Sequence, residues 1–234
     1  MIKGIIFDYG GTIDSRGVHW SEILWDGYCH AAVPIDKTTF RTAYVEGERA
    51  LARERIILPQ DNFHDLLIKK VSLEISFLPM DIDDKTREKW IEQIAAYCDN
   101  SARTCVNEAR PVLEALHERY PLMLVSNFYG NIDEVLREYG IRELFKGIIE
   151  SSVVGIRKPN PTLFRLGVDA LELPAQDVLV VGDSLRKDIE PAEQLGCQAL
   201  WIKGKGWTDE EDNQTHPHTI TRITQVLDWI DKLQ

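Results

Sequence analysis

Three features that would each define a class of protein are scarce or missing in this sequence. Its 234 residues include four cysteines, and their spacing matches neither a zinc-binding pattern nor a CxxC redox motif. No apolar run approaches the ~20 residues of a membrane-spanning helix. The first residues have the texture of a strand and not of a signal peptide. We therefore expect a reduced, cytoplasmic protein that has no membrane partner.

Positive charge is also in short supply. The chain has 27 Lys and Arg against 38 Asp and Glu, which gives a net charge of −11. Such an excess argues against non-specific binding to nucleic acid or to an anionic membrane. The overall field would repel an anionic substrate, so that substrate would need a local cationic site.

Strand patterns are nearly absent between residues 20 and 100, where the apolar spacing is helical. This spacing predicts four consecutive helices: Trp20–Ala32, a second capped by Asp36, a third capped by Asp61, and Asp84–Cys98. Four helices without a strand predict a small helical bundle inserted into the chain. We assign residues 16–100 to this inserted domain, and residues 1–15 and 101–234 to the domain that holds it.

Strands and helices alternate in the rest of the chain. Buried strands are expected at Ile5–Phe7, Leu122–Val125, Ile148–Ile149, Val178–Val181 and Gln198–Ile202. Helices are expected at Arg110–Tyr120, Asn131–Tyr139, Pro161–Leu171 and Asp188–Leu195, with a last amphipathic helix reaching Leu233 and a loop over Lys203–His218. This alternation predicts an α/β fold with a doubly wound, Rossmann-like parallel sheet.

The stretch from Lys3 to Asp14 is the one around which the chain is organised. Its apolar run ends abruptly in Asp8, and Gly10 and Gly11 follow at once. The glycines permit a sharp turn and a close approach of the backbone to a ligand. Open α/β sheets bind their ligands just beyond the carboxyl ends of the strands, which is where Asp8 falls.

Polar residues follow two further strands in the same way. Ser126 and Asn127 end the second long apolar run, and Asp183 ends another, with Asp188 five residues later. Because the carboxyl ends of parallel strands share one edge of the sheet, these side chains should meet in one crevice. Lys158, which lies in a proline-bounded loop, should join them there.

A cluster of carboxylates is stable when a cation lies among its members. A small set of hard oxygen ligands suits Mg²⁺, which keeps several waters and accepts phosphate oxygens. Lys158 would add a point charge for a phosphate, and Ser126 can donate a hydrogen bond to it. A carboxylate nucleophile, a divalent metal and a lysine together suit phosphoryl transfer through an aspartyl-phosphate.

At these positions the sequence resembles the haloacid dehalogenase (HAD) superfamily over nearly its whole length, and the inserted helices resemble a C1-type cap. The resemblance implies that Asp8 is the nucleophile, with Ser126 and Lys158 as catalytic partners. It implies that Gly11, Thr12 and Asn127 shape the substrate site. It also implies that Mg²⁺ is held by Asp8, the Gly10 carbonyl, Asp183 and Asp188.

One position departs from the family pattern. Phosphatases of this superfamily usually carry a second aspartate two residues after the nucleophile, as the general acid and base, and here that position is Gly10. Losing such a group typically costs about 10²–10⁴ in rate. Three residues just beyond the turn are candidates to replace this acid and base: Asp14, Arg16 and His19. The alternative is that each is a hinge residue that leads to the inserted helices.

Four functions stay open on the sequence. The first is a phosphatase acting on a small soluble phosphorylated metabolite, as either a monomer or a homodimer. The second is a dehalogenase, which the metal-type motif at Asp183 argues against. The third is a phosphonatase-like enzyme, which would need a cap lysine such as Lys37, Lys69 or Lys70. The fourth is a catalytically impaired protein that keeps its phosphate site for binding or scaffolding.

Overall fold

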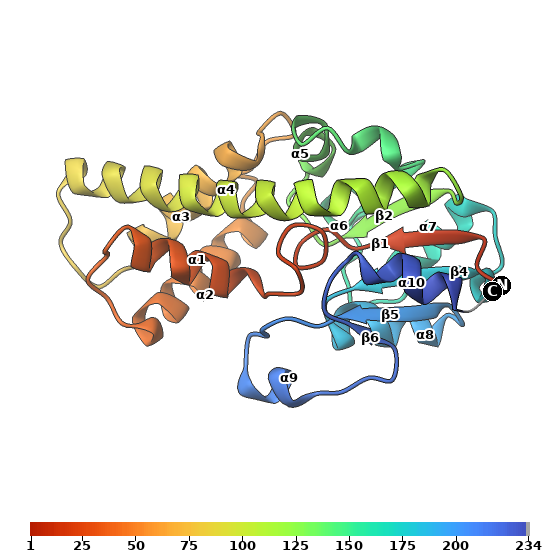
Figure 1. Cartoon of the computed structure of the whole chain (residues 1–234). Helices are drawn as coiled ribbons and strands as arrows, with labels where there is room; N and C mark the ends of the chain where they lie inside the picture. Colours follow the sequence, from red (N-terminus) through yellow and green to blue (C-terminus); the bar gives the residue numbers. More distant parts are fainter. Residues whose placement is uncertain (233–234) are drawn as a thin grey trace.

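The computed structural model describes residues 1–232 and contains a parallel sheet with the order β3-β2-β1-β4-β5-β6 (Figure 1). The first strand lies in the middle of the sheet, between the second and the fourth. The strands are β1 (Gly4–Phe7), β2 (Leu122–Ser126), β3 (Gly147–Glu150), β4 (Val178–Gly182), β5 (Gln198–Ile202) and β6 (Thr219–Ile220). The predicted Rossmann-like α/β fold is confirmed.

Both faces of the sheet are buried, and successive residues of β1 alternate between them. Ile6 packs into a cluster with residues of α7 (Thr162–Leu171) and α8 (Glu190–Gln194). Ile5 and Phe7 belong to a second cluster, which includes residues of α5 (Ile132–Glu138) and α10 (Gln225–Asp231). Because helices cover both faces of the sheet, every residue of β1 is apolar or glycine.

The helical insertion follows β1 as predicted and forms the left half of Figure 1. It contains α1 (Trp20–His30), α2 (Lys37–Arg53), α3 (Phe63–Ser76) and the first part of α4. Asp36 caps α2 by accepting from the Thr39 N–H at 2.7 Å, as expected. Asp61 was the wrong cap for α3: Asn62 caps it, in a reciprocal capping box with Asp65.

Helix α4 (Asp84–His117) corrects a second expectation. It is one helix of 34 residues, where the sequence predicted a helix to Cys98 and a new one from Arg110. Pro111 lies inside it, at the cost of one backbone hydrogen bond. Figure 1 shows α4 running from the insertion across to the sheet, so the predicted domain boundary after residue 100 falls within a continuous helix.

Smaller differences concern short elements. The predicted helix from Asp188 is a π-helical turn over Leu185–Ile189 followed by α8. The predicted loop over Lys203–His218 contains a short helix, α9 (Asp209–Asn213). The sequence did not predict four further short elements: β6, α6 (Ser151–Val154), η1 (Arg142–Leu144) and η2 (Ala175–Asp177). Leu233, which the sequence placed in the last helix, lies outside the described residues. Within residues 1–232, no helix has both the length and the apolar character that crossing a bilayer requires.

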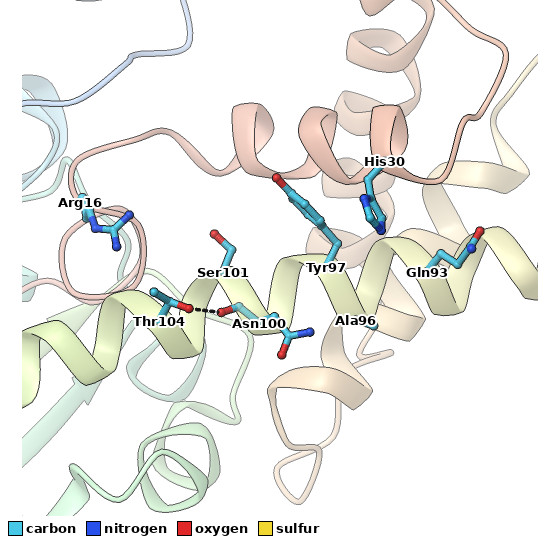
Figure 2. A pocket seen from close by; sticks show the side chains of 8 residues that line it. All are labelled: Arg16, His30, Gln93, Ala96, Tyr97, Asn100, Ser101 and Thr104. Carbon is cyan, nitrogen blue, oxygen red and sulfur yellow. Dashed lines mark hydrogen bonds between the residues drawn. The ribbon is translucent and has the colours of Figure 1, made fainter.

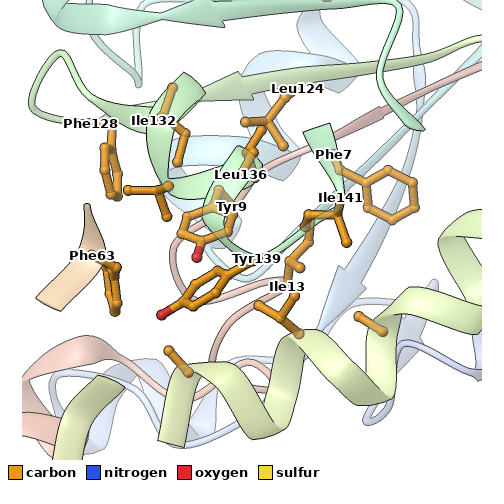
Figure 3. Close-up of a cluster of buried hydrophobic side chains, with 14 of the residues drawn as sticks. Phe7, Tyr9, Ile13, Phe63, Leu124, Phe128, Ile132, Leu136, Tyr139 and Ile141 are labelled. Atoms are coloured by element: carbon orange, nitrogen blue, oxygen red, sulfur yellow. The ribbon is translucent and has the colours of Figure 1, made fainter. Parts of the chain in front are cut away.

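The insertion and the sheet share one apolar cluster, seen in Figure 3. Phe63, at the start of α3, packs edge-on against Tyr9 and Tyr139, with ring centroids 6.5 and 5.8 Å away. On another side, the chain after β5 reaches back to the insertion, where the Trp207 carbonyl accepts from Arg41 at 2.7 Å. These contacts hold the insertion down on the carboxyl edge of the sheet.

A stability test follows from the close approach of two glycines at this junction. Gly17 has φ +80°, and a Cβ there would lie 2.5 Å from the Gly204 nitrogen. Gly17→Ala should therefore destabilise the protein by about 2–4 kcal/mol in urea unfolding, because backbone strain and a backbone clash add. Gly155→Ala is the control, since φ is +73° there but nothing lies within 4 Å of the new Cβ. Equal losses in the two variants would contradict the proposed packing.

Candidate active site

Asp8 lies immediately after β1, where its N–H donates to the Val181 carbonyl at 3.0 Å and keeps the strand's register to the end. The turn that follows requires Gly11, which has φ +98°. A Cβ at that position would lie 2.3 Å from the carboxyl carbon of Asp183. The glycine therefore lets the loop after β1 and the end of β4 come into direct contact.

The Lys158 ammonium joins the nucleophile candidate to the other acidic residues. Its Nζ donates to Asp8 Oδ1 at 2.6 Å and to Asp188 Oδ1 at 2.7 Å. All three side chains are buried. Burial alone would lower the pKa of Lys158, but the carboxylates of Asp188 and Asp8 outweigh it and raise that pKa, so the ammonium stays charged.

Asn127 fixes the lysine in place. Its Oδ1 accepts from the Lys158 N–H at 2.9 Å, and its Nδ2 donates to the Lys158 carbonyl at 3.2 Å. The side chain that the resemblance assigns to substrate binding thus has both of its polar atoms on the backbone of the lysine loop. In this arrangement Asn127 orients Lys158.

The three predicted aspartates meet as the parallel topology requires. Asp8, Asp183 and Asp188 each offer an oxygen, and these oxygens lie within 4.8 Å of one another. Burial and the neighbouring carboxylates raise the pKa of Asp183. Thr12 Oγ1 lies 3.4 Å from Asp183 Oδ1, and the Ser184 N–H donates to Asp188 Oδ2 at 3.0 Å. An all-oxygen, mutually repelling set fits Mg²⁺.

Ser126 places a buried hydroxyl at the site, and this hydroxyl has no hydrogen-bond partner in the part of the chain that the structure describes. The residue is 1 % exposed at the end of β2. A buried hydroxyl without a partner is costly, so the site is complete only when an oxygen-bearing ligand accepts from it. A phosphoryl group beside Lys158 would do so.

Neither the backbone conformation nor the neighbouring atoms require a glycine at position 10. Its φ lies outside the left-handed region, and a Cβ there would meet only Trp20, at 3.8 and 3.9 Å. A Cβ therefore fits at this position without a clash.

Asp14, one of the three candidates to replace the missing acid, is buried beside this gap. Its Oδ1 accepts from the Gly11 N–H at 2.8 Å and its Oδ2 from the Trp20 indole at 2.9 Å. Burial raises its pKa to about 8, although both hydrogen bonds oppose the rise. The sequence predicted a helix that begins at Trp20, but it did not predict that the indole would contact Asp14 and lie beside Gly10.

The other two candidates have other partners. Arg16 pairs with Glu108 on α4, with its Nε 2.7 Å from Glu108 Oε2. His19 caps α1 by accepting from the Ser21 N–H at 3.2 Å, and burial, helped by nearby cations, lowers its pKa to about 4. His19 is therefore neutral at pH 7.

A cavity of about 540 Å³ lies on the outer side of the insertion, between α1 and α4. Figure 2 shows its lining side chains, among them His30 and Tyr97, whose rings stack at 5.0 Å. Of its lining residues only Arg16 was a candidate site residue, and it pairs with Glu108. The side chains of Asp8, Lys158 and Asp188 instead lie buried at the carboxyl edge of the sheet.

The fold and the site together are a doubly wound parallel sheet with a lysine-bridged carboxylate cluster at its carboxyl edge, where open α/β sheets bind their ligands. A family model for haloacid dehalogenase-like hydrolases matches residues 2–196. The chain therefore belongs to the haloacid dehalogenase-like hydrolases, and the resemblance seen in the sequence is confirmed.

Individual relatives agree with this assignment. A glyceraldehyde 3-phosphate phosphatase of Methanocaldococcus jannaschii is 34% identical over 102 residues, which are 43% of this chain and 44% of that protein. A phosphoglycolate phosphatase of Vibrio parahaemolyticus is 25% identical over 86% of this chain and 83% of its own length. The HAD-hydrolase YfnB of Bacillus subtilis, solved with magnesium, has a TM-score of 0.62 at 17% identity, covering 98% of this chain and 99% of that one.

Metal binding can be tested without any substrate. MgCl₂ should raise the melting temperature of the wild type by about 2–4 °C or more, since the ion binds only the folded site. Asp183→Asn should lose this shift and, without metal, should melt above the wild type, because one repelling charge is gone. Asp209→Asn, on exposed α9, is the control. A full magnesium shift in Asp183→Asn would contradict the site.

The buried carboxyl of Asp14 predicts a dependence of stability on pH. Its folded pKa is about 8 against an ordinary 3.8, so its contribution to stability is complete below pH 3.8 and is lost as the pH rises toward 8. Wild type should lose about 1.4 kcal/mol per pH unit relative to Asp14→Asn between pH 5 and pH 7. Urea unfolding at three pH values measures this difference. Parallel curves would mean that Asp14 is ionised in the folded protein.

Proposed function

We propose that this protein is a magnesium-dependent phosphatase that hydrolyses a small phosphorylated metabolite through an aspartyl-phosphate on Asp8. The observation that supports this most directly is the Lys158 ammonium, which contacts Asp8 and Asp188 within 2.7 Å inside the carboxylate cluster. Two relatives whose names give small phosphorylated substrates support the same activity.

The reaction assigns one task to each side chain. An oxygen of Asp8 attacks phosphorus, and the bond from phosphorus to the leaving-group oxygen breaks with both electrons going to that oxygen. Lys158 and the Ser126 hydroxyl compensate the charge on the transferring phosphoryl group. Water then attacks the phosphorus of the aspartyl-phosphate, and the bond from phosphorus to the Asp8 oxygen breaks with its electrons going to that oxygen. This restores the Asp8 carboxylate and releases inorganic phosphate, with the water's proton passing to phosphate or solvent.

The metal would be held by Asp8, Asp183 and Asp188, with the Gly10 carbonyl as the ligand implied by the family pattern. When bound, Mg²⁺ neutralises phosphoryl oxygens and orients them for attack. In its absence, the positive charge beside Asp8 comes from Lys158.

The chain has no general acid and base at the position where phosphatases of this family usually carry one. Position 10 carries no side chain. The raised pKa of Asp14 would keep a proton on it at pH 7, but its two oxygens are held by the Gly11 N–H and the Trp20 indole, and it is not part of the carboxylate cluster. We infer that the leaving group departs without a strong proton donor. We infer that acyl and aryl phosphates, whose leaving groups are weakly basic, turn over much faster than alkyl phosphates.

Restoring the acid tests this proposal. Gly10→Asp should speed hydrolysis of poor leaving groups by about 10–10³-fold and flatten the dependence of log kcat/KM on leaving-group pKa, which should be steep in the wild type. Gly10→Asn is the matched control, because it fills the same space without a proton to give. A series of aryl and alkyl phosphates measured with Mg²⁺ provides the slopes.

Three outcomes would count against the proposal. A flat dependence in the wild type would mean that another residue acts as the acid. Activity that survives in Asp8→Asn would exclude Asp8 as the nucleophile. A wild type that binds Mg²⁺ and phosphate but hydrolyses no ester would instead indicate a binding or scaffolding protein.

A further inference from the structure

A buried lysine at the junction between the helical insertion and the sheet has no part in the proposed reaction. Lys70, on α3, is 4 % exposed. Its ammonium contacts the Glu48 carboxylate of α2 and lies 3.4 Å from the Tyr129 hydroxyl. Glu74 Oε1, one turn further along α3, lies 3.8 Å away. Burying an ammonium is costly, so its position calls for an explanation.

Tyr129 links this lysine to the active site. It lies three residues beyond Ser126, on the loop that follows β2, and its hydroxyl donates to Glu48 Oε1 at 2.9 Å. Burial raises the pKa of Tyr129, and Arg157, the neighbour of Lys158, acts against that rise. Tyr129 therefore joins Lys70 of the insertion to the loop that follows Ser126.

Cations gather at this junction although the chain as a whole is acidic. Burial is the main cause that lowers the pKa of His19. The positive charges of Lys187, Lys70 and Arg41 lower it further. Lys187 immediately precedes Asp188 of the carboxylate cluster. Cationic side chains are therefore present at this junction, beside the carboxylates of Glu48, Glu74 and the aspartate cluster.

The partners of Lys70 differ in how firmly they are held. Glu74 is fully buried, yet its Oε1 has no hydrogen-bond partner among residues 1–232. Glu48, which makes the close contact, has a side chain that is 32% exposed. A carboxylate from a ligand could take the place of Glu48 beside the ammonium and leave the buried charge balanced. The purely structural alternative is a lysine that only joins α2 to α3.

We propose that Lys70 is a specificity-determining residue, which binds a carboxylate on the leaving-group part of the substrate in exchange for Glu48. This inference rests on the proposed phosphatase function. It defines the substrate class as phosphate esters or anhydrides that carry a second acidic group, with Tyr129 donating to the same carboxylate.

Two esters of the same shape test this role. In 4-carboxyphenyl phosphate the leaving group carries a carboxylate, and in 4-carbamoylphenyl phosphate it carries a neutral amide. The ratio of their kcat/KM values measures recognition of the charge. Lys70→Met should lower this ratio about 10–100-fold, the effect expected from losing a charge-assisted hydrogen bond. Lys70→Arg should restore part of it, and Glu48→Gln should keep or raise it.

Binding separates this inference from the proposed function. The same two esters are titrated calorimetrically into Asp8→Asn, with and without Lys70→Met. Tighter binding of the carboxylate ester that depends on Lys70 supports the inference even if the wild type hydrolyses neither ester, which would overturn the phosphatase proposal alone. Hydrolysis of both esters with an unchanged ratio in Lys70→Met would overturn the inference alone.

The lysine variant could be unstable, because it leaves Glu48 and Glu74 without their cation. Thermal unfolding of each variant is therefore measured first. If Lys70→Met does not fold, Lys70→Arg and Glu48→Gln carry the test. A wild-type ratio in Lys70→Arg, or a lowered ratio in Glu48→Gln, would show that Lys70 is structural.

Discussion

The buried contact of Lys158 with Asp8 and Asp188 is the constraint on which the rest of the site depends. Two carboxylates and an ammonium are stable in a buried place only when they are held in direct contact. That contact requires β1 to lie beside β4, the Asn127 side chain to hold the lysine backbone, and Gly182 to leave room for the Asp188 side chain. The order of the strands therefore determines which charged side chains form the ion-paired cluster.

Much of this could be predicted from the sequence, because it follows from local patterns. Apolar runs that end in polar residues marked β1, β2 and β4, and parallel topology placed their ends together. The errors lie where local signals are weak. Asn62 competes with Asp61 for the same cap, β6 has only two residues, and the helical spacing before and after Asn100 gave no reason to join two predicted helices into α4.

The parts that the sequence could not provide are contacts between the insertion and the sheet. Trp20 closes over Gly10 and bonds to Asp14, and Lys70 meets Tyr129, only because of how the inserted helices pack on the strand edge. Each of these residues has an ordinary local context, such as a helix start or a helix face. Their significance depends on distances between segments far apart in the chain, which hydrophobic periodicity does not encode.

The continuity of α4 has a mechanical consequence. At about 1.5 Å per residue the helix is about 51 Å long, and it is shared by the inserted helices and the sheet. The other link between them is the irregular chain from Asp14 to His19. Any change in the angle between the inserted helices and the sheet would therefore have to bend α4 itself or the chain before α1, because these two segments join them.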